Sequence, residues 1–203
     1  MDLTLYRHEQ YYASQIRNQV VLLAADLGLT VGELDAQLAA WEADYRHRHA
    51  NRKPSFGNTL LGCLGYPIAK SVELRRRAIR PEDYLSDDPR LRSTLEELSR
   101  DCRLVLVTNN PRDIAERTLA VLGVQAFFPR IVGLDEAGHS KPHPAAFDLA
   151  YEALALEPGS VVSVGDRFSI DLEVPLARGS GGVLVESMDD VYALPGVLGL
   201  AKS

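Results

Sequence analysis

The stretch Val161–Asp171, which reads VVSVGDRFSID, decides the fold class of this 203-residue chain. Its first four residues (VVSV) are rich in valine, which is typical of a short buried strand. Gly165 and Asp166 follow at once, and Asp171 comes five residues after Asp166, within a helical pattern near 170–178. A strand that leads directly into such a turn and a helix is typical of an α/β domain with a parallel sheet.

The same alternation continues on both sides of this stretch. Asp88 and Pro89 predict an N-cap and the first turn of a helix whose inward residues are Leu91, Leu95 and Leu98. Pro175 lies inside the predicted last helix, which therefore starts late or kinks. Further strands are predicted over 103–107, 130–132 and 183–185, and further helices over 111–122 and 144–156.

The region from about 8 to 88 has a purely helical texture. One apolar stripe consists of Tyr12, Ile16, Val20, Leu23 and Leu27, and Gly28 ends this helix. A capping box of Thr30 and Glu33 opens a second helix, whose stripe is Leu34, Leu38, Trp41 and Tyr45. We expect an all-helical cap over 8–88, inserted into an α/β core made of 1–7 plus 89–203.

Composition narrows the class of protein. With 46% hydrophobic and 25% charged residues, the chain has an ordinary globular composition, which excludes a disordered or coiled-coil protein. The net charge of -6 argues against nucleic acid as a partner, and we interpret the basic runs 46–53 and 75–77 as solvated helix faces. The longest apolar run, Val20–Ala25, is too short to cross a membrane. Because no secretory signal or disulfide framework is visible, we expect a cytoplasmic protein. We also expect a monomer or homodimer without a membrane partner.

Polar residues follow the predicted strands directly. Thr108 and Asn109 follow the strand at 103–107, Asp166 follows the strand at 161–164, and Lys141 lies between these strands. Ligands bind at the carboxyl ends of parallel strands, where hydroxyl, amide and ammonium donors suit phosphate oxygens. Two carboxylates, Asp166 and Asp171, suit Mg²⁺. Each segment alone also has a structural interpretation. The residues after the strand at 103–107 could cap the next helix, Lys141 could lie in a surface loop, and Asp166 could belong to a tight turn.

Taken together, four segments resemble one family. Asp2-x-Thr4-Leu5, then LVLVTNN (104–110), SKPHPAAF (140–147) and VVSVGDRFSID (161–171) are similar to the motifs of the haloacid dehalogenase superfamily of phosphatases. The resemblance implies a Rossmann-like parallel sheet core with an inserted all-helical cap. Within the superfamily the chain is most similar to pyrimidine 5′-nucleotidase-like and phosphoglycolate phosphatase-like enzymes. The expected substrate is a small phosphorylated metabolite, with a nucleoside 5′-monophosphate as one candidate.

The resemblance also implies roles for single residues. Thr108 with Asn109 would bind the transferring phosphoryl group, and Lys141 would neutralise its charge. Asp166 would hold Mg²⁺, and Asp171 would coordinate the metal or orient its site. Asp2 would be the general acid that protonates the leaving group, and it would lend its backbone carbonyl to Mg²⁺.

The first motif departs from the family pattern at its nucleophile. The nucleophilic aspartate would stand two residues before Asp2, which is directly before Met1. We expect that Met1 is an internal methionine of the motif and that the chain as written does not turn over a phosphoester. The alternative is a non-hydrolytic relative that binds phosphate. A haloacid dehalogenase is disfavoured, because its reaction needs no acid at the position of Asp2, and a purely structural protein is a third interpretation.

Specificity is expected to come from the cap. Aromatic and cationic side chains gather over 41–59, where they could stack on a base or bind a second anion. A solvated helix end is the alternative. The residues predicted to contact substrate are Tyr45, Arg46, Arg48 and Arg52.

Overall fold

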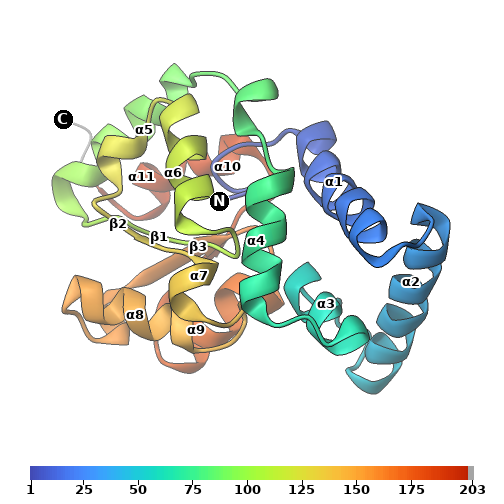
Figure 1. The fold of residues 1–203 in the computed structure, drawn as a ribbon. Coiled ribbons are helices and arrows are strands. Elements are labelled where there is room, and N and C mark those ends of the chain that lie inside the picture. The colour runs from blue at the N-terminus through green and yellow to red at the C-terminus, as the bar shows by residue number, and fades with distance from the viewer. Residues whose placement is uncertain (201–203) are drawn as a thin grey trace.

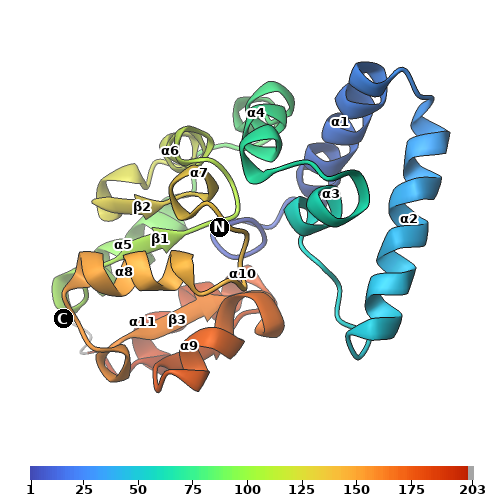
Figure 2. The same ribbon diagram turned by 60° about the horizontal axis from the view of Figure 1, so that its bottom comes forward.

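The structure is a computed structural model, and it describes residues 1–200. Its first part is helical, and Figure 1 shows these helices on one side of the strands, with α2 farthest from them. Figure 2 shows α4 between α1 and the part that carries the strands. The helices are α1 (Glu9–Leu27), α2 (Val31–Arg48), α3 (Phe56–Leu64) and α4 (Ile68–Ala78), followed by the 3₁₀ turn η1 (Pro81–Asp83).

The predicted C-terminal end of α1 and the predicted N-terminal start of α2 are confirmed. Gly28 ends α1 in the left-handed conformation at φ 69°, where a side chain would be strained, and Thr30 and Glu33 form the capping box of α2. The predicted stripe of α1 is confirmed at Val20 and Leu23, which are buried. It is wrong at Leu27, the last residue of α1, which is 38% exposed.

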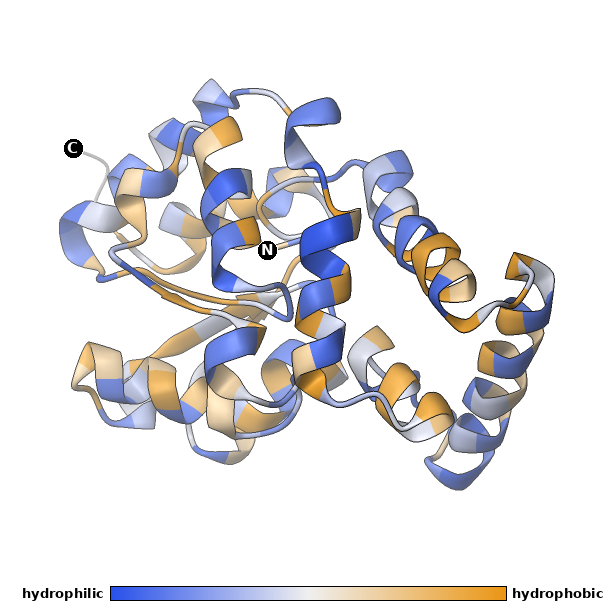
Figure 3. Ribbon diagram, viewed as in Figure 1, coloured by the Kyte–Doolittle hydropathy of each residue, from blue (hydrophilic) through white to orange (hydrophobic). Residues whose placement is uncertain are grey.

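The helical part has an apolar cluster of its own, to which α1, α2, α3 and α4 all contribute. Burying such side chains contributes roughly 1.5–3 kcal/mol each relative to exposing them. Figure 3 shows the corresponding alternation of hydrophobic and hydrophilic positions along α1 and α3. The buried members of the cluster are Val20, Leu23, Ala24, Leu34, Leu38, Leu60 and Leu74.

The second part alternates helices and strands, as the sequence predicts, and Asp88 caps its first helix with Pro89 in the first turn. Short turns η2 (Gln125–Phe127) and η3 (Pro158–Ser160) connect some of the elements. The elements are α5 (Pro89–Asp101), β1 (Val105–Val107), α6 (Arg112–Val121), β2 (Arg130–Val132), α7 (Leu134–Ala137), α8 (Ala145–Leu154), β3 (Val162–Gly165), η4 (Phe168–Leu172), α9 (Glu173–Ala177), β4 (Gly181–Leu184), α10 (Met188–Tyr192) and α11 (Leu194–Val197).

The predicted strand at 130–132 is confirmed at both ends, whereas the others shift by one or two residues. The last strand starts at Gly181, because two glycines that resemble a loop in the sequence pair with β3. The predicted helix near 170–178 is divided into the π-helical η4 and the short α9. Pro175 lies in the first turn of α9, so it costs no helix hydrogen bond.

The strands form two parallel pairs, β1 with β2 and β3 with β4. Helices cover both faces: α5, α6, α10 and α11 lie on one side and α8 and α9 on the other (Figure 1). The larger apolar cluster lies on the first side and includes Leu91, Ile114 and Val191 together with Leu106 of β1. The fold is therefore α/β, with parallel strands between two helical layers.

A cavity of about 200 Å³ separates the two strand pairs. We call it the strand slot: it lies between β1 and β3, and Met1 and Leu5 line it together with residues of both strands. Most of its lining is apolar, with Lys141 and Asp171 among the polar residues. The sequence predicts one parallel sheet, whereas the structure has two strand pairs with the strand slot between them.

Main-chain groups of β1 and β3 face the strand slot. The carbonyl oxygen of Val107 accepts a hydrogen bond from Lys141 Nζ instead of from β2. Since successive residues of a strand point their N–H and C=O groups to opposite sides, Val105 faces the slot as well.

On β3 the carbonyl oxygens of Val161 and Gly165 accept hydrogen bonds from the β4 side. By the same alternation, Val162 and Val164 direct their main-chain groups toward the slot. The slot is thus bounded by two strand edges that have no strand partner on that side among the described residues.

The interpretation of 75–77 as a solvated helix face is wrong at one residue. Arg76 and Arg77 are exposed, whereas Arg75 is 5% exposed, because the helical turn points it into the interface between α4 and the rest of the molecule. Figure 3 shows the hydrophilic character of the last turn of α4. Across residues 1–200, helices long enough to span a membrane lack the necessary apolar character.

Candidate active site

The carboxyl end of β1 carries Thr108, Asn109 and Asn110. The Thr108 amide donates to the Val132 carbonyl at the end of the ladder, and the Asn110 amide donates to Thr108 Oγ1 over 3.1 Å. Thr108 is buried, with 3% exposed. This local turn presents a hydroxyl and two amide side chains at the end of a strand, as the sequence predicts.

Lys141 is held against the same end of β1. Its backbone amide donates to Asn109 Oδ1 over 2.7 Å, and its Nζ donates to the Val107 carbonyl over 3.0 Å. Nζ also donates to Asp171 Oδ1 over 2.7 Å. A single ammonium therefore links the end of β1 to η4, so Lys141 is part of the site and not of a surface loop.

Asp171 is a buried carboxylate that remains ionised. Burial by itself raises its pKa, but the charge and hydrogen bond of Lys141, together with the charges of the N-terminal amine and Arg167, outweigh this effect, so the pKa of Asp171 lies below its usual value. Its Oδ2 accepts a hydrogen bond from the Arg167 amide. Gly165 permits this position, since a Cβ there would lie 2.4 Å from the Cβ of Asp171.

Asp166 follows β3 and faces the N-terminal segment. Its Oδ1 accepts a hydrogen bond from Thr4 Oγ1 over 3.1 Å, and Arg167 Nε lies 3.9 Å from its Oδ2. The contact joins residues that are 162 positions apart in the sequence. The first and last predicted motifs therefore meet in space.

Asp2 is surrounded by hydrogen-bond donors. Its Oδ1 accepts from the Tyr6 hydroxyl and from Gln15 Nε2, and its Oδ2 accepts from Asn110 Nδ2 over 3.0 Å. Burial and the Asp2 charge raise the pKa of Tyr6, so this hydroxyl keeps its proton. The donors come from three segments and hold the Asp2 carboxylate in one orientation.

Tyr6, Gln15 and Asn110 were not assigned roles from the sequence. Gln15 carries the clearest signal, because it is a polar residue on the buried side of α1, where it is 5% exposed. Its neighbours in the sequence do not reveal Asp2 as its partner, since the contact depends on how α1 crosses the N-terminal segment. Asn110 directly precedes Pro111, the N-cap of α6, and its side chain donates to Asp2 instead of capping that helix.

The four motif segments thus converge at one end of the strands, and comparison with known proteins agrees with this geometry. A family model described as haloacid dehalogenase-like hydrolase matches residues 1–176. The chain belongs to the haloacid dehalogenase-like hydrolases. The resemblance expected from the sequence is confirmed, as is the α/β fold class.

Curated relatives of this chain include several phosphatases. Glyceraldehyde 3-phosphate phosphatase of Methanothermobacter thermautotrophicus is 32% identical over 197 residues, which is 92% of this chain and 83% of that protein. N-acylneuraminate-9-phosphatase of Rattus norvegicus is 32% identical over 66% of this chain and 55% of its own length. Pyrophosphatase PpaX of Oceanobacillus iheyensis is 33% identical over 46% of this chain and 44% of its own length. The chain therefore spans about half the length of these last two relatives.

Solved structures of the family share the fold. A phosphatase from Thermococcus onnurineus superimposes with a TM-score of 0.58 at 23% identity, over 96% of this chain and 89% of that one. A 2-haloacid dehalogenase from Pseudomonas syringae gives a TM-score of 0.59 at 19% identity, over 98% and 95% of the two chains. Because both phosphatases and a dehalogenase share this arrangement, the fold alone leaves the reaction open.

The carboxylates of this site suit Mg²⁺ more by the chemistry of their oxygen atoms than by their positions in the structure. Mg²⁺ prefers oxygen ligands and needs only one or two carboxylates besides waters and phosphate oxygens. Within residues 1–200, no three His, Cys, Asp or Glu side chains are close enough together to hold a metal ion. Asp171 is engaged by Lys141, whereas one oxygen of Asp166 accepts no hydrogen bond from residues 1–200. The residues present therefore fit a site centred on Asp166.

The residues predicted to contact substrate from the helical part have other partners. Tyr45 stacks between Trp41 and His49 at centroid distances of 5.3 and 4.1 Å. Arg46 and Arg48 pair with Glu42 and Asp44 of their own helix, and Arg52 pairs with Glu173 of α9 over 2.7 Å. Their role in binding substrate stays a prediction.

Proposed function

We propose that this protein is a Mg²⁺-dependent phosphomonoester hydrolase that acts on small phosphorylated metabolites through an aspartyl-phosphate. The observation that carries the proposal is the meeting of Lys141, Asp171, Asp166 and Asp2 around the carboxyl ends of β1 and β3. Three relatives are named for a phosphatase activity on glyceraldehyde 3-phosphate, N-acylneuraminate 9-phosphate or phosphoglycolate, which supports this substrate class. A nucleoside 5′-monophosphate belongs in the same test panel.

The phosphoryl group would bind between Thr108, Asn109 and Lys141. A transferring phosphoryl group carries charge on three oxygens, so catalysis depends on placing donors before the reaction begins. The Lys141 ammonium is fixed by Val107 and Asp171 and would need no rearrangement to meet such an oxygen. Asp171 acts here chiefly by orienting Lys141.

Asp2 would protonate the leaving oxygen. A general acid must be held within hydrogen-bond reach of the atom that it protonates. Tyr6, Gln15 and Asn110 supply that orientation. An acid at this position also favours ester hydrolysis over dehalogenation, since a departing halide takes no proton.

Asp166 would hold Mg²⁺, with the backbone carbonyl of Asp2 as a further ligand, and Asp171 would coordinate the metal or orient its site. When bound, the metal would neutralise charge on the phosphoryl oxygens. Thr4 donates to one oxygen of Asp166, and among the described residues the other oxygen accepts no hydrogen bond. Residues 8–88 would act as the cap that covers this site.

The nucleophile would be an aspartate directly before Met1, at the end of a strand that occupies the strand slot. The surroundings of the Met1 amine support this position. Burial and the charge of Lys141 lower the pKa of the amine, whereas the charges of Asp2, Asp171 and Asp166 raise it, so all four side chains lie near it. A residue attached there would stand among the four groups named above. The competing proposal is a phosphate-binding protein without turnover.

The test is phosphate release by two lengthened chains. Each carries four β-branched apolar residues followed by Asp or by Asn directly before Met1, so the two differ in one functional group. We expect the Asp form alone to release phosphate from the panel, and EDTA to abolish that release. Phosphate binding by both forms without turnover by either favours the competing proposal. Turnover that EDTA does not change contradicts the metal role of Asp166. The intact mass of the protein from its own cells shows whether it exceeds the 22.3 kDa of this chain by the mass of additional residues that include an aspartate.

A further inference from the structure

Arg75 is a buried cation for which the described residues supply no carboxylate partner. Its Nη1 donates to the carbonyl and hydroxyl oxygens of Ser71, one turn earlier on α4, and these are its only hydrogen bonds within residues 1–200. Burial lowers the pKa of Arg75 to about 10, and only the Asp2 charge opposes this shift. Since an uncompensated buried charge is costly, the position calls for an anion.

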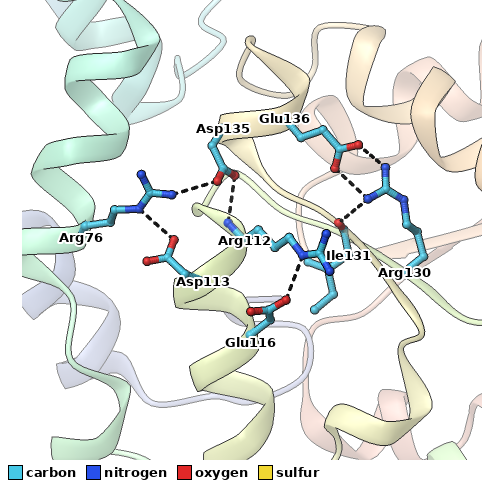
Figure 4. A network of polar contacts seen from close by, with 8 residues as sticks. All are labelled: Arg76, Arg112, Asp113, Glu116, Arg130, Ile131, Asp135 and Glu136. Carbon is cyan, nitrogen blue, oxygen red and sulfur yellow. Dashed lines mark hydrogen bonds and ion pairs between the residues drawn. The ribbon is translucent and has the colours of Figure 1, made fainter.

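Arg75 is also held firmly relative to the strands, because its neighbour anchors α4. Arg76 pairs with Asp113 over 2.9 Å and with Asp135 over 3.0 Å, and Asp135 in turn accepts the Arg112 amide. Figure 4 shows this network between α4 and the start of α6. Arg75 therefore has a fixed position beside the site, although it belongs to the helical part.

Ser140 provides a second unsatisfied group at the same place. It directly precedes Lys141 and is 2% exposed, and its Oγ has no hydrogen-bond partner within residues 1–200. A Cβ built on Gly57 would lie 2.6 Å from Ser140 Oγ and 3.9 Å from Arg75 Nη2, so the Ser140 hydroxyl and the Arg75 guanidinium both lie close to the first turn of α3. Orphaned buried hydroxyls are uncommon and indicate an absent partner.

The N-terminal end of α3 adds backbone donors beside Arg75 and Ser140. Gly57 lies in the first turn of α3, where amides have no acceptor within the helix and the helix dipole favours negative charge. Ser55 satisfies only the Asn58 amide with its side chain. A guanidinium, an orphaned hydroxyl and a helix N-terminus thus face one another next to Lys141.

We propose that Arg75, Ser140 and the first turn of α3 bind a second anionic group of the substrate, a carboxylate or a further phosphate on the leaving-group side. The inference rests on the proposed function. In that proposal Asp2 protonates the leaving oxygen, and the Asp2 charge is felt by Arg75, whose pKa it raises. The substrate class narrows accordingly to phosphoesters whose leaving group is itself anionic.

The test compares three probes that differ in the second anion. In the presence of Mg²⁺, calorimetry measures binding of 2-phosphoglycolate, inorganic pyrophosphate and ethyl phosphate to the chain. Ethyl phosphate has the skeleton of 2-phosphoglycolate with a methyl group in place of the carboxylate. We expect at least one anionic probe to bind at least tenfold more tightly than ethyl phosphate, and the tighter probe identifies the second anion. The preference is expected to vanish in Arg75→Gln and to weaken in Ser140→Ala.

Arg77→Gln is the matched control, because Arg77 lies on the same helix but is exposed and pairs with Asp26. It should retain the preference of the wild type. Equal binding of the three probes by the wild type, or an unchanged preference in Arg75→Gln, overturns the inference even if phosphoesters are hydrolysed.

A second measurement separates this inference from the proposed function. Glycolate, which has no phosphoryl group, should raise the thermal midpoint of the wild type and of Arg77→Gln but not of Arg75→Gln. If phosphoesters fail to bind yet glycolate gives this pattern, the phosphate site is wrong and the anion site stands. If glycolate raises no midpoint while phosphoesters bind without preference, the anion site is wrong.

Discussion

The Lys141 ammonium lies 2.7 Å from the Asp171 carboxylate, and the two side chains are only 9% and 8% exposed. Their Coulomb attraction is strong because little water screens it, but both charges lost their hydration on burial. The pair therefore contributes more to fixing the position of the ammonium than to net stability. Removing one partner alone is the costly change.

Lys141→Met should lower the free energy of unfolding by about 3–5 kcal/mol, because it leaves the Asp171 charge buried without its partner. Lys141→Met combined with Asp171→Asn should recover a large part of that loss. Urea unfolding of the wild type, both single variants and the double variant gives the coupling energy. Additive losses would contradict a direct interaction between the two side chains.

The pair of Lys141 and Asp171 also predicts how the stability of the fold decreases at acidic pH. The pKa of Asp171 is depressed in the folded protein, although burial acts the other way, so the folded state binds its proton less readily than the unfolded state. The Asp171 carboxylate therefore contributes its full stabilisation above its unfolded-state pKa of about 3.9, and this stabilisation is lost as pH falls through its folded-state pKa. Unfolding midpoints between about pH 5 and pH 2 should therefore fall more steeply for the wild type than for Asp171→Asn. Asp148→Asn, at an exposed ion pair with Arg178, is the control and should follow the wild type.

Sequence patterns were sufficient where a local rule determines the structure. Thr30 with Glu33, Gly28, and Asp88 with Pro89 satisfy backbone groups of their own helices, so short spacings identify them. The apolar runs that became β1 and β3 were found for the same reason. The π-helical η4 was not predicted, because hydrogen bonds to the fifth residue leave no distinct apolar period.

Contacts across the molecule explain what the sequence did not reveal about the site. Asp2, Thr108, Lys141 and Asp166 were identified through motifs that resemble a family, whereas the donors to Asp2 were missed. Arg75 shows the limit most clearly. Three consecutive arginines resemble a solvated face, and only the position of α4 between α1 and α7 decides which of them is buried.

Tyr6 predicts a loss of stability on the alkaline side. Burial and the charge of Asp2 raise its pKa, so the folded protein keeps the hydroxyl protonated while the unfolded chain ionises near pH 10. Its contribution is present below about pH 10 and is lost as pH rises further. Thermal midpoints from pH 8 to pH 11 should fall more for the wild type than for Tyr6→Phe, with Tyr45→Phe behaving like the wild type. Parallel curves for all three proteins would show that the pKa of Tyr6 does not differ between the folded and unfolded states.

The edges of the strand slot predict a pattern of amide hydrogen exchange. Val105, Val107, Val162 and Val164 direct their amides into the slot, whereas the amides of Thr108 and Gly181 already donate to neighbouring strands. In the chain of residues 1–203 the four valine amides should exchange faster than those two controls. Lengthening the chain by the apolar strand that ends in Asn should slow their exchange about 100-fold or more, which corresponds to roughly 2.7 kcal/mol of added local protection. The control amides should change less than the valines. Unchanged valine exchange in a lengthened chain would show that the added segment does not enter the slot, and the nucleophile would then need another position.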